Sequence, residues 1–200
     1  MYLKVPYQIS NGILKFCNSI NPSSKPTYVQ MAPIPGAIQN ECFGNVDKKI
    51  ERSGGNKIHG WTIWEWKGIF IEAEFHAVWK SPKGSLVDVC LPSDNNEKRK
   101  LFLPNPEITY KERRVNNIRK ALRNDPIIQH FFDAHNEKQA FLERHSLPGE
   151  FGPIKVPKVE AEKIEMKIAQ IQSQLLKLPP LNTNELCFCG SGMKYKHCCL

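Results

Sequence analysis

The chain has 200 residues, of which 40% are hydrophobic, and this length suits one compact domain with appended segments. No run of about eighteen apolar residues occurs, which excludes a membrane-spanning helix. The formal net charge of +8 and the pI near 9.1 favour an acidic partner surface, such as RNA, the ribosome or an anionic protein. The segment MYLKVPYQIS lacks the apolar stretch of a signal peptide, so we expect a cytoplasmic protein with reduced thiols.

Composition divides the chain into four parts. Residues 1–39 contain two proline-rich turns and are expected to form an extended N-terminal arm. Residues 40–146 mix strand and helix patterns and are expected to form an α+β core domain. Residues 147–181 comprise a linker rich in proline and glycine and an amphipathic helix, and residues 182–200 form a cysteine-rich tail.

Cys42, the first candidate functional residue along the chain, precedes an apolar i, i+4 pair, which predicts that it begins a helix. At a helix N-terminus, the dipole and a nearby protonated histidine would favour the reactive thiolate. The backbone N–H of Cys42 is then the expected oxyanion donor, with Gln39 or Asn45 as side-chain candidates. The alternative interpretation of Cys42 is a small buried hydrophobic residue.

His76 and Asp88 lie on two successive predicted strands. Over residues 68–79 apolar side chains occupy the odd positions, whereas His76 lies on the even face and so points away from the most hydrophobic side. A Pro-Lys-Gly turn and then LVDV predict the returning strand of a hairpin. Either possible register, with Asp88 opposite His76 or opposite Val78, places both side chains on one face. The carboxylate can then accept an imidazole N–H.

Four other residues of the chain could join or surround the group of Cys42, His76 and Asp88. Glu72 and Glu74 share the even face with His76 and could instead join it in a second metal site, although no ligand spacing supports that alternative. Cys17 and Cys90 have no partner pattern, and we interpret both as structural residues.

The segment from Glu41-Cys42 through EAEFHAVWKSPKGSLVDV resembles the Cys, His and Asp motifs of papain-like enzymes of the transglutaminase and NlpC/P60 type. The resemblance spans residues 38–92. It implies a papain-like (transglutaminase-like) core with an antiparallel sheet and helices. The residues after this core are expected to add an amphipathic helix and a small zinc element with four cysteine ligands. The resemblance also implies that Cys42 attacks a carboxamide or thioester carbonyl, that His76 acts as general base and then acid, and that Asp88 orients His76.

Basic side chains are concentrated between residues 111 and 123. They surround Val115, Ile118 and Leu122, and this pattern predicts one amphipathic helix. Its charges form either a solvated face or a patch that contacts phosphates of RNA or the ribosome. The basic residues are Lys111, Arg113, Arg114, Arg119, Lys120 and Arg123.

Two further helices are expected near the C-terminus. Asp125-Pro126 has the pattern of an N-cap and a first-turn proline, which predicts that a helix begins there. After the linker, apolar residues recur at three- and four-residue steps, which predicts a second helix with one apolar stripe. This stripe packs on the core, pairs with a second copy of the chain, or belongs to a rigid arm that carries the tail. The stripe consists of Ala161, Ile164, Ile168, Ile171, Leu175 and Leu178. The oligomeric state stays open.

The tail LCFCGSGMKYKHCC contains four of the seven cysteines of the chain. Cys187 and Cys189 form one pair and Cys198 and Cys199 another, with a glycine-rich turn between them, as a short tetrahedral Zn²⁺ site requires. Two disulfides are the alternative, but adjacent cysteines do not easily bridge each other, and clustered thiols in an intracellular chain more often hold metal. We therefore expect one structural zinc ion, with His197 as a possible substitute for Cys198 or Cys199.

The sequence CFCGSGMKYKHCC resembles the SEC-C zinc motif, the C-terminal element of the preprotein translocase motor. Phe188 departs from the pattern, because proline is frequent at that position. The motor uses this element to dock a chaperone and the ribosome, so the resemblance implies an adaptor role for the tail.

Two functions from different classes follow. The first is a zinc-containing cysteine hydrolase or acyltransferase that acts on protein or peptide amide bonds through Cys42, His76 and Asp88, with the tail as its docking module. The second is a noncatalytic zinc-binding adaptor that docks to a protein partner, a chaperone or the ribosome. The choice between hydrolysis, deamidation and transfer does not follow from the sequence.

Overall fold

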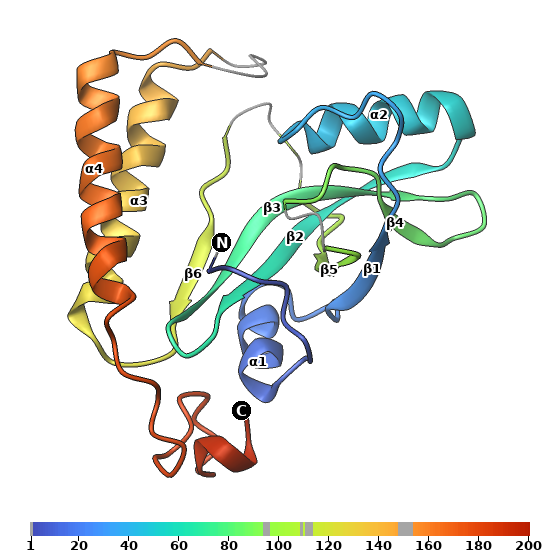
Figure 1. The fold of residues 1–200 in the computed structure, drawn as a ribbon. Helices are drawn as coiled ribbons and strands as arrows, with labels where there is room; N and C mark the ends of the chain where they lie inside the picture. Colours follow the sequence, from blue (N-terminus) through green and yellow to red (C-terminus); the bar gives the residue numbers. More distant parts are fainter. Residues whose placement is uncertain (1, 94–96, 109, 111–113, 148–153) are drawn as a thin grey trace.

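The structure is a computed structural model, and it describes residues 2–93, 97–108, 110, 114–147 and 154–200 (Figure 1). The elements follow in the order α1 (Asn11–Ile20), β1 (Thr27–Met31), α2 (Cys42–Ser53), β2 (Asn56–Trp66), β3 (Phe70–Lys80), β4 (Leu86–Asp88), β5 (Arg99–Pro104), β6 (Ile118–Ala121), α3 (Pro126–Arg144), α4 (Lys158–Leu175) and the short 3₁₀ helix η1 (Tyr195–His197).

Five strands form a closed, mixed β-barrel. Their order is β2-β5-β1-β4-β3, and the long antiparallel pairing of β2 with β3 closes the ring. The pairing of β1 with β4 is parallel, while the other pairs are antiparallel. β6 lies outside the ring and extends the sheet from the first half of β3.

The expectation of a papain-like, transglutaminase-like core is therefore wrong. The barrel closes because β1 inserts between β4 and β5, and β1 lies in the segment that we expected to be an extended arm. The prolines of that segment flank β1 without interrupting it, since Pro26 directly precedes the strand and Pro33 follows it. The same segment also forms helix α1, which begins at a Ser10 N-cap.

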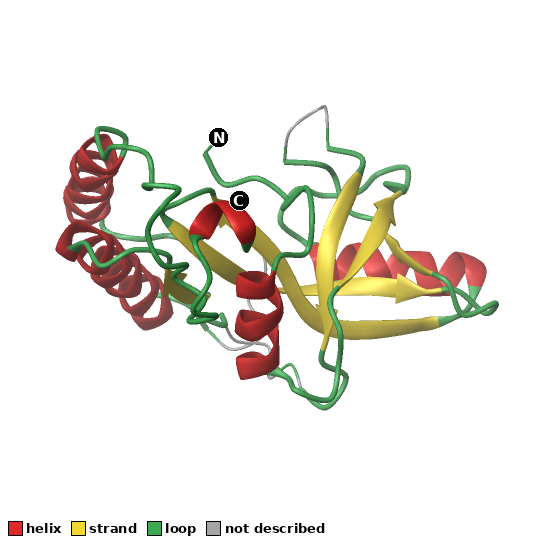
Figure 2. Ribbon diagram, turned by 90° about the horizontal axis from the view of Figure 1, so that it is seen from below, coloured by secondary structure: helices red, strands yellow, loops and turns green. Residues whose placement is uncertain are grey.

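The helices cover the barrel on separate sides (Figures 1 and 2). α1 contributes Ile13, Phe16 and Cys17 to a buried cluster with residues of β2, β3 and β5. α2 packs on β3 through a cluster that contains Val46 and Ala77. α3 and α4 form a pair on the opposite side from α2, and their buried side chains pack on the Ile69–Phe70 turn region.

The predictions for α3 and α4 are confirmed. The Asp125 carboxylate accepts a hydrogen bond from the Ile127 N–H, and Pro126 lies in the first turn of α3. The apolar stripe of α4 packs on the cluster that it shares with α3, so it covers part of the core. The prolines and glycines of the predicted linker at residues 148–153 lie outside the described residues.

The prediction of one amphipathic helix around the basic residues 111–123 is wrong. Ile118–Ala121 is strand β6, which supplies backbone partners to the free edge of β3 at Phe70–Ala73. Arg119 pairs with Glu72, and both side chains are at least nine-tenths buried, so Arg119 is not part of a solvated basic face. Lys111 and Arg113 lie outside the described residues. Within the described part of the chain, none of the helices has the length and apolar character needed to cross a membrane.

Candidate functional site

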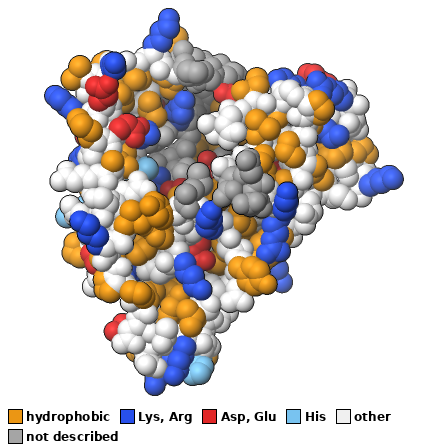
Figure 3. All heavy atoms as spheres, in the orientation of Figure 1, with side chains coloured by type: hydrophobic (Ala, Val, Ile, Leu, Met, Phe, Trp, Pro, Cys, Tyr) orange, Lys and Arg blue, Asp and Glu red, His pale blue; other side chains and the backbone are white. Residues whose placement is uncertain are grey.

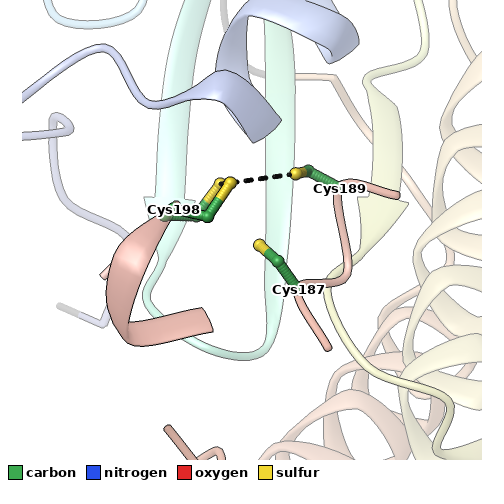
Figure 4. Close-up of side chains that lie close together, drawn as sticks. Cys187, Cys189 and Cys198 are labelled. Atoms are coloured by element: carbon green, nitrogen blue, oxygen red, sulfur yellow. Dashed lines mark hydrogen bonds between the residues drawn. The ribbon is translucent and has the colours of Figure 1, made fainter. Parts of the chain in front are cut away.

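The four cysteines of the tail converge on one point. Cys187 and Cys189 lie on a turn that bends through Gly190 and Gly192, at φ of 69° and 75°, which only glycine adopts readily. η1 then returns the chain and carries the second pair of cysteines to the first. All four sulfur atoms lie within 4.8 Å of one another. Figure 4 shows three of the side chains pointing into the shared space.

Helix α1 holds this cluster against the barrel. The N–H of Gly12, in the first turn of α1, donates to Cys199 Sγ at 3.2 Å, and Asn11 Nδ2 donates to Cys198 Sγ at 3.7 Å. The Lys15 ammonium donates to the carbonyl of Cys189 at 2.8 Å. Positive helix-end charge and N–H donors stabilise sulfur that carries negative charge. The cysteine cluster is therefore docked on its own chain.

The residues of the cluster fit a tetrahedral metal ion. Four sulfur ligands within this distance need only small shifts to reach the length of Zn–S bonds. Burial opposes ionisation of Cys189, but hydrogen bonds from Ser191 and two neighbouring thiols lower its pKa to about 6. His197 is exposed and lies outside the group of four cysteines, so the set does not include it.

Residues 184–200 match the SEC-C motif. The match confirms the predicted SEC-C element, and the four cysteines that lie in it could hold a metal ion. Neither the curated proteins nor the solved structures include a significant match to the chain. The comparison thus covers the tail, and the barrel must be interpreted from its own geometry.

The SEC-C motif also contributes a side chain that packs on a hydrophobic cluster of the barrel. Phe188, the residue that departs from the usual proline, packs on the cluster formed by α1, β2, β3 and β5. A Cβ atom at Gly12 would lie 2.8 Å from the Phe188 ring, so the glycine permits the close approach of α1 to the tail. An aromatic side chain at this position joins the SEC-C motif to the barrel.

A second candidate site lies in a cavity of about 480 Å³ on the barrel. Its walls come from the start of α2, from β3, from the segment after β4 and from α3. Figure 3 shows the surface hollowed between the side that carries α3 and α4 and the side that carries α2. Cys42, His76 and Cys90 all line this cavity.

Cys42 is the first residue of α2, so the prediction that it begins a helix is confirmed. Asn40, two residues earlier, has φ of 62°, a left-handed conformation that asparagine tolerates, and this bend leads the chain into the helix. Asn45 holds the same bend, because its side chain bonds the N–H of Ile38 at 2.9 Å and the carbonyl of Ile38 at 2.8 Å. Asn45 is thus engaged with backbone, whereas Gln39 lines the cavity.

His76 and Asp88 contact each other across the β3–β4 hairpin. The pairs Trp79–Val87 and Lys80–Leu86 fix the register that places Asp88 opposite Val78 and diagonal to His76. Asp88 Oδ2 lies 3.0 Å from His76 Nε2, and Asp88 Oδ1 accepts the N–H of Cys90 at 2.9 Å. The carboxylate is fully buried, and only 12% of the His76 side chain is exposed. The hairpin therefore fixes the orientation of the imidazole.

The electrostatics of the group favour a charged histidine beside a thiol. Burial alone would lower the pKa of His76, but the Asp88 carboxylate and the sulfur of Cys42, which also hydrogen-bonds to His76, raise it well above its usual value. Burial would raise the pKa of Asp88, but His76 and the N–H of Cys90 lower it to about 2. The direction of this shift favours the protonated form of His76.

Cys90 is the member of this site that sequence analysis missed. Its ligand atom and those of His76 and Asp88 lie within 4.8 Å of one another, whereas the sequence pattern indicated a structural residue. The signal was its position two residues after Asp88, because an aspartate side chain often bonds the backbone N–H two residues later, as Asp88 does here. Cys17 is fully buried on the inner face of α1, and burial raises its pKa to about 12, as expected of a structural cysteine.

The buried Asp88 carboxylate makes stability depend on pH. Its pKa is about 2 in the folded protein against a reference of 3.8, so its stabilising contribution is present above pH 4 and is lost as the pH falls toward 2. We expect Asp88→Asn to lower the free energy of unfolding by about 2 kcal/mol at pH 7, with a smaller difference from wild type at pH 3. Urea unfolding at several pH values measures this. Asp133→Asn, at an exposed carboxylate, should change stability by less than about 0.5 kcal/mol.

Proposed function

We propose that the protein is a cysteine-dependent acyl hydrolase or acyltransferase that acts on amide or thioester carbonyls of a protein or peptide. The observation that carries the proposal is that Cys42 and His76 line one open cavity, while Asp88 holds the His76 ring from behind at 3.0 Å. A sulfur nucleophile, an imidazole and an orienting carboxylate in that order are the groups that acyl transfer requires.

In the proposed reaction, the Cys42 thiolate attacks the substrate carbonyl, and the first N–H groups of α2 receive the developing negative charge. These N–H groups have no partner within the helix, which makes them suitable oxyanion donors. His76 donates its proton to the leaving group, and an acyl thioester forms on Cys42. His76 then takes a proton from water or from an acceptor amine, which attacks the thioester and restores the thiolate.

Each residue of the group has a separate task in this scheme. Asp88 holds His76 in one orientation and stabilises its positive charge, and Gln39 is the proposed side-chain donor at the oxyanion position. The metal in the SEC-C motif is proposed to be one zinc ion held by Cys187, Cys189, Cys198 and Cys199. Four thiolates fill a tetrahedral shell, so this zinc has a structural role and takes no part in the reaction.

Selective alkylation of Cys42 tests the proposal. We expect iodoacetamide at neutral pH to label Cys42 at least about tenfold faster than Cys17 or Cys90, because a thiolate reacts much faster than a buried thiol. Peptide mass spectrometry, on protein that holds zinc in the SEC-C motif and with no Zn²⁺ added, measures the three rates. His76→Ala should slow the labelling of Cys42, whereas His130→Ala, at an exposed histidine of α3, should leave the rate unchanged.

The alternative is a noncatalytic, metal-binding adaptor, and the SEC-C match is the observation that favours it. An adaptor needs no activated thiol, so it predicts slow labelling of Cys42 that does not depend on His76. That result would replace the enzyme proposal with the adaptor. With any substrate that the enzyme turns over, Cys42→Ala should abolish turnover while the far-UV circular dichroism spectrum stays unchanged.

A further inference from the structure

The cavity contains a set of metal-ligating side chains separate from the SEC-C motif. We propose that His76, Asp88 and Cys90 form a second site for a zinc-class divalent cation. The SEC-C cysteines and this set are the two groups of three or more such side chains that come together within the described residues. The acidic residues that share a strand face with His76 are engaged elsewhere, because Glu72 pairs with Arg119 and Glu74 accepts a hydrogen bond from Trp64.

The distances between the three ligand atoms suit one ion. The His76 nitrogen and the Asp88 oxygen are 3.0 Å apart, and all three ligand atoms lie within 4.8 Å. Ligands at about 2.0 Å for nitrogen or oxygen and about 2.3 Å for sulfur are separated by roughly 3.3–3.7 Å around a tetrahedral ion. Small side-chain rotations would therefore bring the three atoms to bonding distance.

Charge and burial also favour a divalent cation. Asp88 is fully buried and Cys90 is 7% exposed, so neither group is a solvated surface residue. One carboxylate and one thiolate neutralise a divalent ion, and a neutral imidazole completes the set, which leaves no net charge in a buried site. Nitrogen, oxygen and sulfur ligands together are typical of zinc and of similar borderline-soft metals.

The site would be accessible and partly preorganised. His76 and Cys90 line the cavity, so an ion can enter from solvent. The N–H of Cys90 bonds the second oxygen of Asp88 at 2.9 Å, which fixes the carboxylate next to the sulfur. Such bonds to a ligating carboxylate strengthen metal binding.

Occupation of this site would switch off the proposed enzyme. An ion bound to His76 and Asp88 removes the imidazole proton and the orienting contact, so His76 can no longer act as acid and base for Cys42. This consequence rests on the proposed function, whereas the metal site itself does not. Cys90 would then act as the residue that makes the triad sensitive to free zinc.

Metal stoichiometry of the full chain tests the site. We expect equilibrium dialysis against micromolar Zn²⁺, followed by elemental analysis, to give two equivalents for wild type and one for Cys90→Ala. Ser93→Ala, at another residue of the cavity wall, should retain two. Loss of the sulfur ligand should weaken binding of the second ion by more than about tenfold, as even outer-shell changes cost ten- to a hundredfold.

Labelling of Cys42 separates this inference from the proposed function. Added Zn²⁺ should slow alkylation of Cys42 by about tenfold or more in wild type and have no such effect in Cys90→Ala. One zinc equivalent in wild type, or two in Cys90→Ala, would overturn the second site even if Cys42 reacts fast. Two equivalents that depend on Cys90, together with slow labelling in the absence of added Zn²⁺, would retain the site and reject the enzyme.

Discussion

Removing the proposed zinc ion from the SEC-C motif should destabilise the barrel as well as the tail. The cysteine cluster orders the segment that carries Phe188, and this ring packs on the buried cluster of α1, β2, β3 and β5. Loss of that packing alone removes about 2 kcal/mol, which corresponds to a decrease in Tm of about 5 °C for a protein of this size. The first turn of α1 also loses its bonds to Cys198 and Cys199.

Circular dichroism and calorimetry on two variants measure this effect. Cys189→Ser removes one cluster ligand, whereas Cys42→Ala removes a thiol outside the cluster and should keep the metal and the wild-type Tm. A strong chelator should lower the Tm of wild type toward that of Cys189→Ser. If Cys189→Ser loses its metal while the barrel unfolds at the wild-type temperature, the tail does not stabilise the barrel.

Local signals in the sequence identified several elements of the fold correctly. The Asp125-Pro126 cap, the apolar stripe of α4 and the helix start at Cys42 each depend on residues within a few positions of one another. The β3–β4 hairpin also follows from local patterning, because strand periodicity and a short turn restrict which faces meet. The cysteine spacing of the SEC-C motif is local in the same sense.

Pairings between distant segments could not be read from the same signals. β1 joins the barrel through partners more than fifty residues away, and no pattern within Thr27–Met31 specifies which strands lie beside it. Ile118–Ala121 carries a mixture of basic and apolar residues that is compatible with a helix, yet the free edge of β3 makes it a strand. The papain-like expectation was wrong because similar local motifs around a cysteine, a histidine and an aspartate do not specify how a sheet closes.

The candidate site shows the same division between local and distant information. His76 and Asp88 lie on one face because of strand periodicity, and their hydrogen bond follows from the hairpin. The proximity of Cys90 depends on the bend of the chain after β4, where the Cys90 N–H bonds the Asp88 carboxylate, and the sequence does not signal this bend strongly. Asn45 has the chemistry of an oxyanion donor, but the bend at Ile38 uses both of its amide atoms.

The buried pair of Glu72 and Arg119 gives the second large expected effect. We expect Arg119→Met to reduce the free energy of unfolding by about 3–5 kcal/mol at pH 8, because it leaves the Glu72 carboxylate buried without its counter-charge. Burial already raises the pKa of Glu72 in the wild-type protein, and Arg119 opposes that rise. Without Arg119 the pKa should rise further, so the folded variant should take up a proton more readily than the unfolded chain.

The raised pKa of Glu72 also predicts how the stability deficit of Arg119→Met changes with pH. A raised folded pKa means that the variant gains stability relative to wild type as the pH falls, so its deficit should be smaller at pH 5 than at pH 8. Urea unfolding at both pH values measures the difference, and Lys120→Met, the next residue of β6, should change stability by less than about 1 kcal/mol. Adding Glu72→Gln to Arg119→Met should recover part of the loss, since the amide carries no charge. If Arg119→Met loses as little stability as Lys120→Met, the ion pair with Glu72 is not the reason for the position of Arg119, which then belongs to the solvated basic face. RNA binding would then test the interpretation that these basic residues contact phosphates.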